Sequence, residues 1–303
     1  MDDLNPRTLD AERRQLMGLA YRMMGTIADA EDAVQETYVR WYRLADDERD
    51  AIVNPGAWLT RVASRVCLDS LGSARARRER YVGEWLPEPV PGESPFGSRV
   101  AEASDPLDRV SLDDSVSTAL LVVLESLSPA ERVTFVLHDV FGVPFAEIAE
   151  TVGRSVDATR QLASQARKHV RDRREGAATR AVHDALAQAF AEACATGDMA
   201  ALVTILDPDV VLHADGGGFV SAARRPVFGA DRVARFMLGI PRLAPDAQIV
   251  PTLTPDGLGF FVTLDGAPDS VITVGVRGNC VTNVWIVRNP EKLTLWAGAA
   301  GLT

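Results

Sequence analysis

Two neighbouring stretches decide the expected fold of the first third of the chain: Asp29–Arg43, with the sequence DAEDAVQETYVRWYR, and Asn54–Leu71, with the sequence NPGAWLTRVASRVCLDSL. Asp29 can cap a helix, and apolar residues of the first stretch return at helical spacing. Asn54 followed by Pro55 is a second start signal, because asparagine caps helices and proline fits the first helical position. The sequence therefore predicts an acidic helix beside a helix that becomes basic at its end. Such a pair suits a protein partner on one face and nucleic acid on the other.

Length and composition indicate a folded protein of two or three domains. The chain has 303 residues, of which 47% are hydrophobic and 24% are charged, as in ordinary globular proteins. No apolar run approaches the roughly 20 residues needed to span a bilayer, and the N-terminus is acidic where a secretory signal would be basic. The three cysteines and four histidines are scattered, so we expect reduced thiols, no metal site and no cofactor. These features predict a cytoplasmic protein.

Positive charge is concentrated in two parts of an acidic chain. The net charge is −10, which by itself argues against a nucleic-acid binder. Residues 51–80 nevertheless carry six arginines against two acidic residues, and residues 151–180 carry eight cations against three acidic residues. Contacts to phosphate need only local positive charge. Because both basic islands lie at the ends of expected helices, we interpret them as nucleic-acid surfaces rather than as solvated helix faces.

The chain changes character at residue 81 and again at residue 112. Residues 81–111 contain Trp85-Leu-Pro-Glu-Pro89 and further prolines, which a helix interior excludes, so we expect an acidic, partly extended linker. Residues 112–175 return to helical patterns. Ser128-Pro-Ala-Glu131 is a capping box, and Gly153 separates two helical segments of which the second has a basic end. Together these signals predict a helix-turn-helix.

The second helix of this motif has a polar face that suits DNA. At 100° per residue, small and apolar side chains gather on one side and mostly polar or cationic ones on the other. Arginine is the commonest reader of guanine in the major groove, and the later cations suit phosphates. A solvated helix can show the same stripe, but the preceding helix and turn favour DNA. The predicted contacts are Ser155, Asp157, Arg160, Gln161, Ser164, Arg167, Lys168 and Arg171.

Residues 178–303 combine helices with alternating strands. Asp265-Gly266 and Gly278-Asn279 are typical of hairpin turns. Helices followed by a curved antiparallel sheet indicate an α+β domain with a concave face. Helices are expected at about 181–195, 198–206 and 229–238, and strands at 210–215, 259–264, 270–276 and 280–287.

The first two segments together resemble an extracytoplasmic-function (ECF) sigma factor, a promoter-specificity subunit of bacterial RNA polymerase, with both of its core regions. The third segment resembles the SnoaL-like branch of the NTF2-like, cone-shaped fold. Trp85–Pro89, Asp215-Gly-Gly-Gly218 and Asn289-Pro-Glu-Lys-Leu293 are similar to signatures of the sigma-factor group that carries a SnoaL-like extension. One position departs from this group, because Phe219 stands where a basic residue usually follows the glycines.

The resemblance implies a multi-domain protein. It has two all-α sigma domains, a region 2 bundle over residues 1–80 and a region 4 helix-turn-helix over residues 112–175, and an α+β SnoaL-like domain over residues 178–303. It also implies a transcription initiation factor rather than an enzyme. The implied partners are promoter DNA and core RNA polymerase, through its β′ clamp helices and β flap, with no membrane.

The resemblance also assigns roles to both stretches quoted at the start. The acidic helix would dock on the β′ clamp helices through Asp29, Glu31, Asp32, Gln35, Glu36 and Arg40. The following helix would hold the −10 promoter element through Trp58, Arg61, Ser64, Arg65, Arg75, Arg77, Arg78 and Arg80, because aromatic and guanidinium groups stack on unpaired bases and follow their phosphates. Trp58 also fits the apolar stripe of the core. The −10 preference stays open, since Arg65 stands where the family often has asparagine.

We expect the SnoaL-like domain to pack against the sigma portion and to tune promoter binding by an intramolecular contact, where other sigma factors use a separate anti-sigma protein. Three glycines in succession allow unusual backbone angles and the close approach of a neighbour. The candidate contact residues are Trp85, Pro87, Asp215, Gly216, Gly217, Gly218, Asn289, Pro290 and Lys292.

Two other functions stay open. SnoaL-like domains include cyclases and hydrolases, so a pocket with His213, Asp215, Asp265 and Arg288 would bind or turn over a small hydrophobic ligand. His213 and Asp215 share one face of a strand, although both also fit structural roles in a wall and a turn. A helix-turn-helix regulator that does not join polymerase is the third alternative, and it would leave the acidic helix without a purpose.

Overall fold

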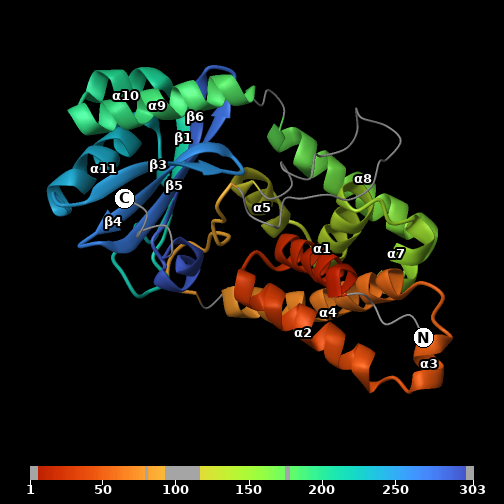
Figure 1. Ribbon diagram of the computed structural model, residues 1–303. Coiled ribbons are helices and arrows are strands. Elements are labelled where there is room, and N and C mark those ends of the chain that lie inside the picture. Colours follow the sequence, from red (N-terminus) through yellow and green to blue (C-terminus); the bar gives the residue numbers. More distant parts are fainter. Residues whose placement is uncertain (1–5, 79–80, 93–116, 175–177, 298–303) are drawn as a thin grey trace. The chain divides into compact units, whose positions relative to one another are not determined.

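The computed structural model describes residues 6–78, 81–92, 117–174 and 178–297 and divides into two compact units (Figure 1). The helical unit comprises residues 1–79, 94–116 and 120–173, and the sheet unit comprises residues 80–93, 117–119 and 174–303. The expected combination of all-α domains with an α+β domain is confirmed. The linker, however, is not a separate element, because its described part, residues 81–92, belongs to the sheet unit. Its remainder, residues 93–111, lies outside the described residues.

Four helices form the first part of the helical unit. Their apolar residues return every three or four positions and bury Leu19, Met23, Val34 and Leu59 in a common core. Asn54 caps the fourth helix as expected, because its Oδ1 accepts a hydrogen bond from the Ala57 amide at 3.0 Å. The helices are α1 (Pro6–Met24), α2 (Ile27–Arg43), α3 (Asp46–Asp50) and α4 (Pro55–Arg78).

The cap of α2 differs from the expectation. Thr26, not Asp29, occupies the cap position, and its Oγ1 accepts a hydrogen bond from the Asp29 amide at 3.3 Å. The same hydroxyl donates to Asp29 Oδ2 at 2.8 Å. Asp29 therefore lies in the first turn of α2, where a negative charge favours the helix dipole. Threonine and aspartate are both good caps, so sequence alone did not separate them.

The second part of the helical unit contains the expected helix-turn-helix. The capping box is present, since Ser128 Oγ accepts from the Glu131 amide at 3.3 Å and Glu131 Oε2 accepts from the Ser128 amide at 2.9 Å. Gly153 ends the first helix of the motif with φ +66°, a left-handed conformation that glycine adopts without strain. The elements are α5 (Thr118–Glu125), α6 (Pro129–Phe135), the π-helical turn η2 (Val136–Val140), α7 (Phe145–Val152) and α8 (Val156–Arg174).

The sheet unit is a six-stranded mixed sheet in the order β2-β1-β6-β5-β4-β3. β1 and β6 are parallel, and the other neighbours are antiparallel. The edge strands β2 and β3 were not expected from the sequence. The strands are β1 (Leu206–Asp215), β2 (Val227–Phe228), β3 (Gln248–Thr254), β4 (Gly257–Leu264), β5 (Ala267–Arg277) and β6 (Cys280–Val287). The helices are α9 (Arg180–Thr196), α10 (Met199–Ile205) and α11 (Ala230–Leu243).

Both faces of this sheet are covered. On one face, residues such as Phe260, Ile272 and Ile286 join α9, α10 and α11 in one hydrophobic core (Figure 1). On the other face, Phe261 lies against Trp296, with ring centroids 5.4 Å apart. Trp296 belongs to the 3-10 turn η4 (Thr294–Trp296), which follows η3 (Pro290–Lys292). This second face also receives the linker residues, and it positions the site described below.

Three further features concern membrane spans, thiols and metal sites. None of the helices in the described ranges is long and apolar enough to cross a membrane. The three cysteines, Cys67, Cys194 and Cys280, are free thiols. Among the described residues, no group of three His, Cys, Asp or Glu side chains has the arrangement of a metal site.

Candidate functional site

The polar side of α2 carries the residues predicted to bind polymerase. Ala30, Ala33, Val34, Thr37 and Trp41 face the core. The polar residues between them point outward: Glu31, Asp32, Gln35 and Arg40 are exposed, and Asp29 and Glu36 are partly buried. Glu36 pairs with Arg40 at 2.8 Å, and both side chains are about two-fifths exposed (43% and 42%). The helix therefore presents a mainly acidic surface.

On α4, two arginines predicted to bind DNA contact the first helix of the helix-turn-helix. Arg61 Nη1 lies 3.0 Å from Glu150 Oε2. Arg65 Nη1 donates to the Thr151 carbonyl at 2.8 Å, and its Nε lies 3.5 Å from Asp69 Oδ1. Exposed ion pairs of this kind contribute at most about 1 kcal/mol. Both guanidinium groups can therefore exchange these partners for phosphate.

Two other residues of α4 are less accessible than expected. Ser64 is fully buried and donates its hydroxyl hydrogen to the Thr60 carbonyl at 2.7 Å, so we remove it from the candidate DNA contacts. Trp58 is partly buried and meets Trp41 edge to face at 5.2 Å between centroids, which fits its role in the core. Arg75, Arg77 and Arg78 lie in the last turns of α4, but their side chains and all of Arg80 lie outside the described residues.

The recognition helix α8 separates a buried face from an exposed one, as predicted. Thr159, Ala163, Ala166 and Val170 are buried. Most of the predicted DNA contacts are exposed, namely Ser155, Asp157, Arg160, Gln161, Ser164, Lys168 and Arg171.

Arg167 differs from the other predicted contacts on α8. Its Nε lies 2.6 Å from Oδ1 of Asp139, a residue of η2 that is only 5% exposed. This ion pair ties α8 to the preceding helices. Arg167 is therefore placed to position the recognition helix, while the exposed cations around it remain available to DNA.

In the sheet unit, the predicted regulatory residues meet around Asp215, which has no exposed surface. Its Oδ1 accepts hydrogen bonds from the Tyr81 hydroxyl at 2.6 Å and the Gly217 amide at 3.0 Å. Its Oδ2 accepts from the Leu86 amide at 3.0 Å and from Lys292 Nζ at 2.7 Å. A buried carboxylate needs such donors to offset its lost hydration. We call Tyr81, Leu86, Asp215, Asn289 and Lys292 the Asp215 cluster.

Lys292 joins the three sequence motifs within this cluster. Besides Asp215, its Nζ donates to the Leu86 carbonyl at 2.6 Å. The same ammonium lies 4.2 Å from the ring centroid of Trp85 and 5.1 Å from that of Tyr81, so two aromatic faces stabilise its charge. Burial and the Asp215 carboxylate raise the pKa of Tyr81, so its hydroxyl stays protonated and donates.

The glycine loop closes the cluster from the other side. Asn289 Nδ2 donates to the Tyr81 hydroxyl at 2.7 Å, and the Asn289 amide donates to the Asp215 carbonyl at 3.0 Å. Gly217 has φ +64°, and a Cβ at this position would lie 2.5 Å from Asn289 Cγ. Gly218 has φ +79°, and a Cβ at this position would lie 3.1 Å from Val82 Cβ, a tighter contact than most but no overlap. These two positions explain the glycines, because a side chain would displace either the asparagine or the linker.

The linker itself is part of the core of this unit. Residues 86–90 are all buried, and they comprise the last four residues of the Trp85–Pro89 motif and Val90. Pro89 presents its carbonyl to Trp296 Nε1 at 2.9 Å, and the Gly92 amide donates to the Leu253 carbonyl of β3 at 2.8 Å. The segment is therefore hydrogen-bonded to the sheet at two places, Asp215 at the end of β1 and Leu253 in the edge strand β3.

His213, Asp215, Asp265 and Arg288, the residues of the alternative ligand pocket, do not converge on one cavity in the structure. His213 Nδ1 lies 3.1 Å from Glu84 Oε2 of the linker. Asp265 is exposed in the turn between β4 and β5. Arg288 pairs with Asp269 at 2.5 Å and donates to the Ser221 carbonyl at 2.6 Å. His213 and Arg288 thus have separate structural partners, and Asp215 is enclosed by the linker.

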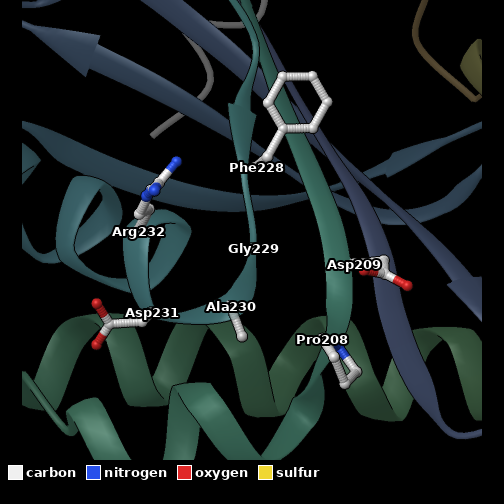
Figure 2. Close-up of a pocket in the computed structure, with 7 residues that line it drawn as sticks. All are labelled: Pro208, Asp209, Phe228, Gly229, Ala230, Asp231 and Arg232. Carbon is white, nitrogen blue, oxygen red and sulfur yellow. The ribbon is translucent and has the colours of Figure 1, made fainter.

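Another hollow in the sheet unit also lacks convergent groups. It has a volume of about 480 Å³ and lies where β1, β2 and the start of α11 meet, between Pro208, Phe228 and Arg232. Figure 2 shows that its two carboxylates, Asp209 and Asp231, point to opposite sides. Asp231 is engaged by Arg235 at 2.9 Å. An acid and a base need mutual reach to act together, and the two carboxylates of this hollow do not converge.

Comparison with known proteins found family models for both helical parts of the chain and relatives that match nearly all of it. The family model described as Sigma-70 region 2 matches residues 9–77, and that described as Sigma-70, region 4 matches residues 117–170. The ECF RNA polymerase sigma factor SigJ of Mycobacterium tuberculosis (strain ATCC 25618 / H37Rv) is 41% identical over 300 residues, which cover 94% of this chain and 92% of SigJ. The chain belongs to the ECF RNA polymerase sigma factors. It is therefore a transcription initiation factor.

The similarity of this sigma factor to its relatives extends beyond the two sigma regions. The probable ECF RNA polymerase sigma factor SigI of M. tuberculosis (strain CDC 1551 / Oshkosh) is 42% identical over 293 residues, which cover 93% of this chain and 92% of SigI. The crystal structure of M. tuberculosis SigJ matches with a TM-score of 0.73 and 37% identity, and it covers 96% of this chain and 98% of that one. The predicted family and fold class are confirmed.

Sequence reasoning missed three residues that join the linker to the rest of the sheet unit: Tyr81, Glu84 and Trp296. Tyr81 and Glu84 lie just before the Trp85–Pro89 motif, and Trp296 lies just after the Asn289–Leu293 motif. Their proximity to these motifs is the only signal that the sequence offered. Their partners lie 129 to 208 residues away, a separation that no local pattern encodes.

Proposed function

We propose that this sigma factor binds core RNA polymerase through the polar face of α2 and binds two promoter elements through α4 and α8. Three observations support this assignment. The α2 face is acidic and exposed, Arg61 and Arg65 of α4 hold only weak, exchangeable partners, and α8 presents one continuous polar stripe. Complementary charge guides such interfaces and limits them to the right partner.

Charge reversal tests the polymerase surface. Asp32→Arg should reduce retention of the full chain on immobilised core polymerase and reduce transcription in proportion, because it places a cation in the acidic face. The matched control is Asp246→Arg, an equally drastic change at an exposed residue of the sheet unit. Equal retention of the two variants would contradict the assignment of α2.

We further propose that the sheet unit restrains transcription by holding the segment that connects regions 2 and 4. The single observation that carries this proposal is the buried Asp215, which accepts two linker hydrogen bonds from Tyr81 and Leu86. Residues 79–117 would span roughly 130 Å when fully extended. With residues 81–92 bound to the sheet unit, the share of these residues, roughly 40 Å, can no longer extend. Release of the linker would restore this length and let the two sigma regions take separate positions on the promoter.

A double substitution tests this restraint. Asp215→Asn with Lys292→Met removes both charges of the buried ion pair in one variant. We expect faster hydrogen exchange in residues 81–92 and more transcript from core polymerase reconstituted with this variant. The matched control removes an exposed ion pair of the same unit, Asp231→Asn with Arg235→Met, and should change neither. Faster linker exchange with unchanged transcription would show that the linker contact is structural only.

A further inference from the structure

The hairpin turn between β3 and β4 is held in place by the first turn of α9. Arg180 Nη2 donates to the Thr254 carbonyl at 3.3 Å, and the Leu258 amide donates to Asp184 Oδ1 at 2.7 Å. Within the turn, Thr254 Oγ1 donates to the Gly257 carbonyl at 2.8 Å. These bonds fix the backbone on both sides of residue 256.

A buried histidine adds a further support to this turn. His183 Nε2 lies 3.0 Å from the Val274 carbonyl, and its Nδ1 lies 3.0 Å from Asp184 Oδ1. Gly257 has φ +135°, and a Cβ at this position would overlap the His183 ring. The histidine thus packs directly under the backbone that carries Asp256. The turn is rigid without any contribution from the Asp256 side chain.

Both carboxylate oxygens of Asp256 are directed at the start of α5 instead. Oδ2 accepts from the Thr118 amide at 2.9 Å, and Oδ1 accepts from the Ala119 amide at 3.2 Å. The Thr118 hydroxyl oxygen also lies 3.4 Å from Thr273 Oγ1, within the same unit. Burial raises the pKa of Asp256, while the hydrogen bonds from Thr118 and Ala119 and the charge of His183 lower it.

The first amides of a helix have no partner within the helix, and a carboxylate at this end also favours the helix dipole. Residues 117–119 belong to the sheet unit, whereas the rest of α5 belongs to the helical unit as the first helix of region 4. Two of the first amides of this helix therefore donate to a residue that lies 138 and 137 positions later in the sequence.

We propose that Asp256 is a positioning residue, which caps the first turn of α5 and fixes the point at which the chain leaves the sheet unit after residues 117–119. Gly92 is already attached to β3 through the Leu253 carbonyl at 2.8 Å. With Thr118 attached to the adjacent turn, the connection between the two sigma regions is fastened to the sheet unit at both ends. The consequence for transcription rests on the restraint proposed above, but the cap itself does not.

Hydrogen exchange of the full chain tests the cap directly. In Asp256→Ala, the peptide that spans residues 118–125 should exchange roughly tenfold faster, the effect of losing a good helix cap. The matched control is Asp265→Ala, which alters the neighbouring hairpin turn between β4 and β5, and it should leave this peptide unchanged. Unchanged exchange at residues 118–125 in Asp256→Ala would overturn the proposal.

A variant on the other side of the contact guards against a general loss of the turn. Thr118→Pro removes the amide that binds Asp256, and proline is well accepted at the first helical position. If both changes remove one interaction, their effects on residues 120–125 should not add in the double variant. Fully additive effects would overturn the proposal. Faster exchange of α5 with unchanged transcription would support the cap and count against the restraint proposed for the linker.

Discussion

Lys292 and Asp215 form an ion pair from which water is excluded: Nζ and Oδ2 are 2.7 Å apart, and the two side chains are 6% and 0% exposed. A pair in such a place owes its stability to its other hydrogen bonds as much as to its charges. Asp215 has three further donors, whereas Lys292 also donates to the Leu86 carbonyl and lies against the rings of Trp85 and Tyr81. The two residues are therefore not equivalent, and single substitutions should differ.

Removal of the acid should cost more than removal of the base. Asp215→Asn takes from the buried Lys292 ammonium the carboxylate that lies 2.7 Å away and should lower the stability of the sheet unit by about 3–5 kcal/mol. Lys292→Met leaves the carboxylate with three donors and should cost clearly less. Thermal unfolding of both variants measures the order. The reverse order would show that the aromatic rings, rather than Asp215, hold the charge of Lys292.

Alanine substitutions at Gly217 and Gly266 distinguish the cost of backbone strain from the cost of a steric clash. Gly217 and Gly266 both have positive φ, at +64° and +77°, but a Cβ on Gly217 would meet Asn289 whereas one on Gly266 meets nothing within 4 Å. Alanine at either position costs about 1 kcal/mol for its conformation. Gly217→Ala should also expose the linker to hydrogen exchange, and Gly266→Ala should not. Equal exchange would place Gly217 outside the regulatory contact.

The sequence was sufficient for most helices and strands, because their boundaries are marked by local chemistry. The Asn54 cap, the Ser128–Glu131 capping box and Gly153 all act where they were expected. The edge strand β3 was missed because it contains Pro251, which a central strand would exclude but an edge strand accepts. The cap of α2 was misplaced by three residues, since Thr26 and Asp29 are both suitable.

The sites were predictable to the extent that they depend on helix periodicity. The exposed stripe of α8 follows from spacing, but the pairing of Arg167 with Asp139 depends on how two helices meet. The three motifs predicted to form a contact do meet in the structure, where one buried carboxylate joins them with partners up to 134 residues distant. Ser64 faces the core because the apolar stripe of α4 is wider than the periodicity indicated.

The thiol of Cys67 should be almost inert. Burial, with a smaller effect of Asp29, raises its pKa to about 12. The thiolate is the reactive form of cysteine, and it stays scarce until the pH approaches the pKa. The thiolate fraction of Cys67 at pH 8 should therefore be about a thousandfold lower in the folded protein than in an unfolded chain. Titration with a disulfide reagent should show this difference between native and denatured protein. Rapid modification of native Cys67 would show that the region 2 core opens frequently.

Arg171 and Arg167 of α8 should differ in their effect on the salt dependence of DNA binding. Arg171 is exposed, so Arg171→Ala should weaken binding to promoter DNA and reduce the slope of log affinity against log salt by about 1, the value for one lost phosphate contact. Arg232→Ala, an exposed arginine of the sheet unit, is the matched control and should leave the slope unchanged. An unaltered slope in the Arg171 variant would remove this residue from the DNA surface.

Arg167→Ala should act on stability instead. The substitution removes the guanidinium group that lies 2.6 Å from the Asp139 carboxylate, and this carboxylate is nearly inaccessible to water. Loss of a charged partner from a buried carboxylate destabilises a fold far more than loss of a surface ion pair. Thermal unfolding should therefore shift to lower temperature, and the salt slope of the remaining folded protein should stay close to that of the unaltered chain. A fall in slope equal to that of Arg171→Ala, without loss of stability, would mean that Arg167 leaves Asp139 to bind a phosphate.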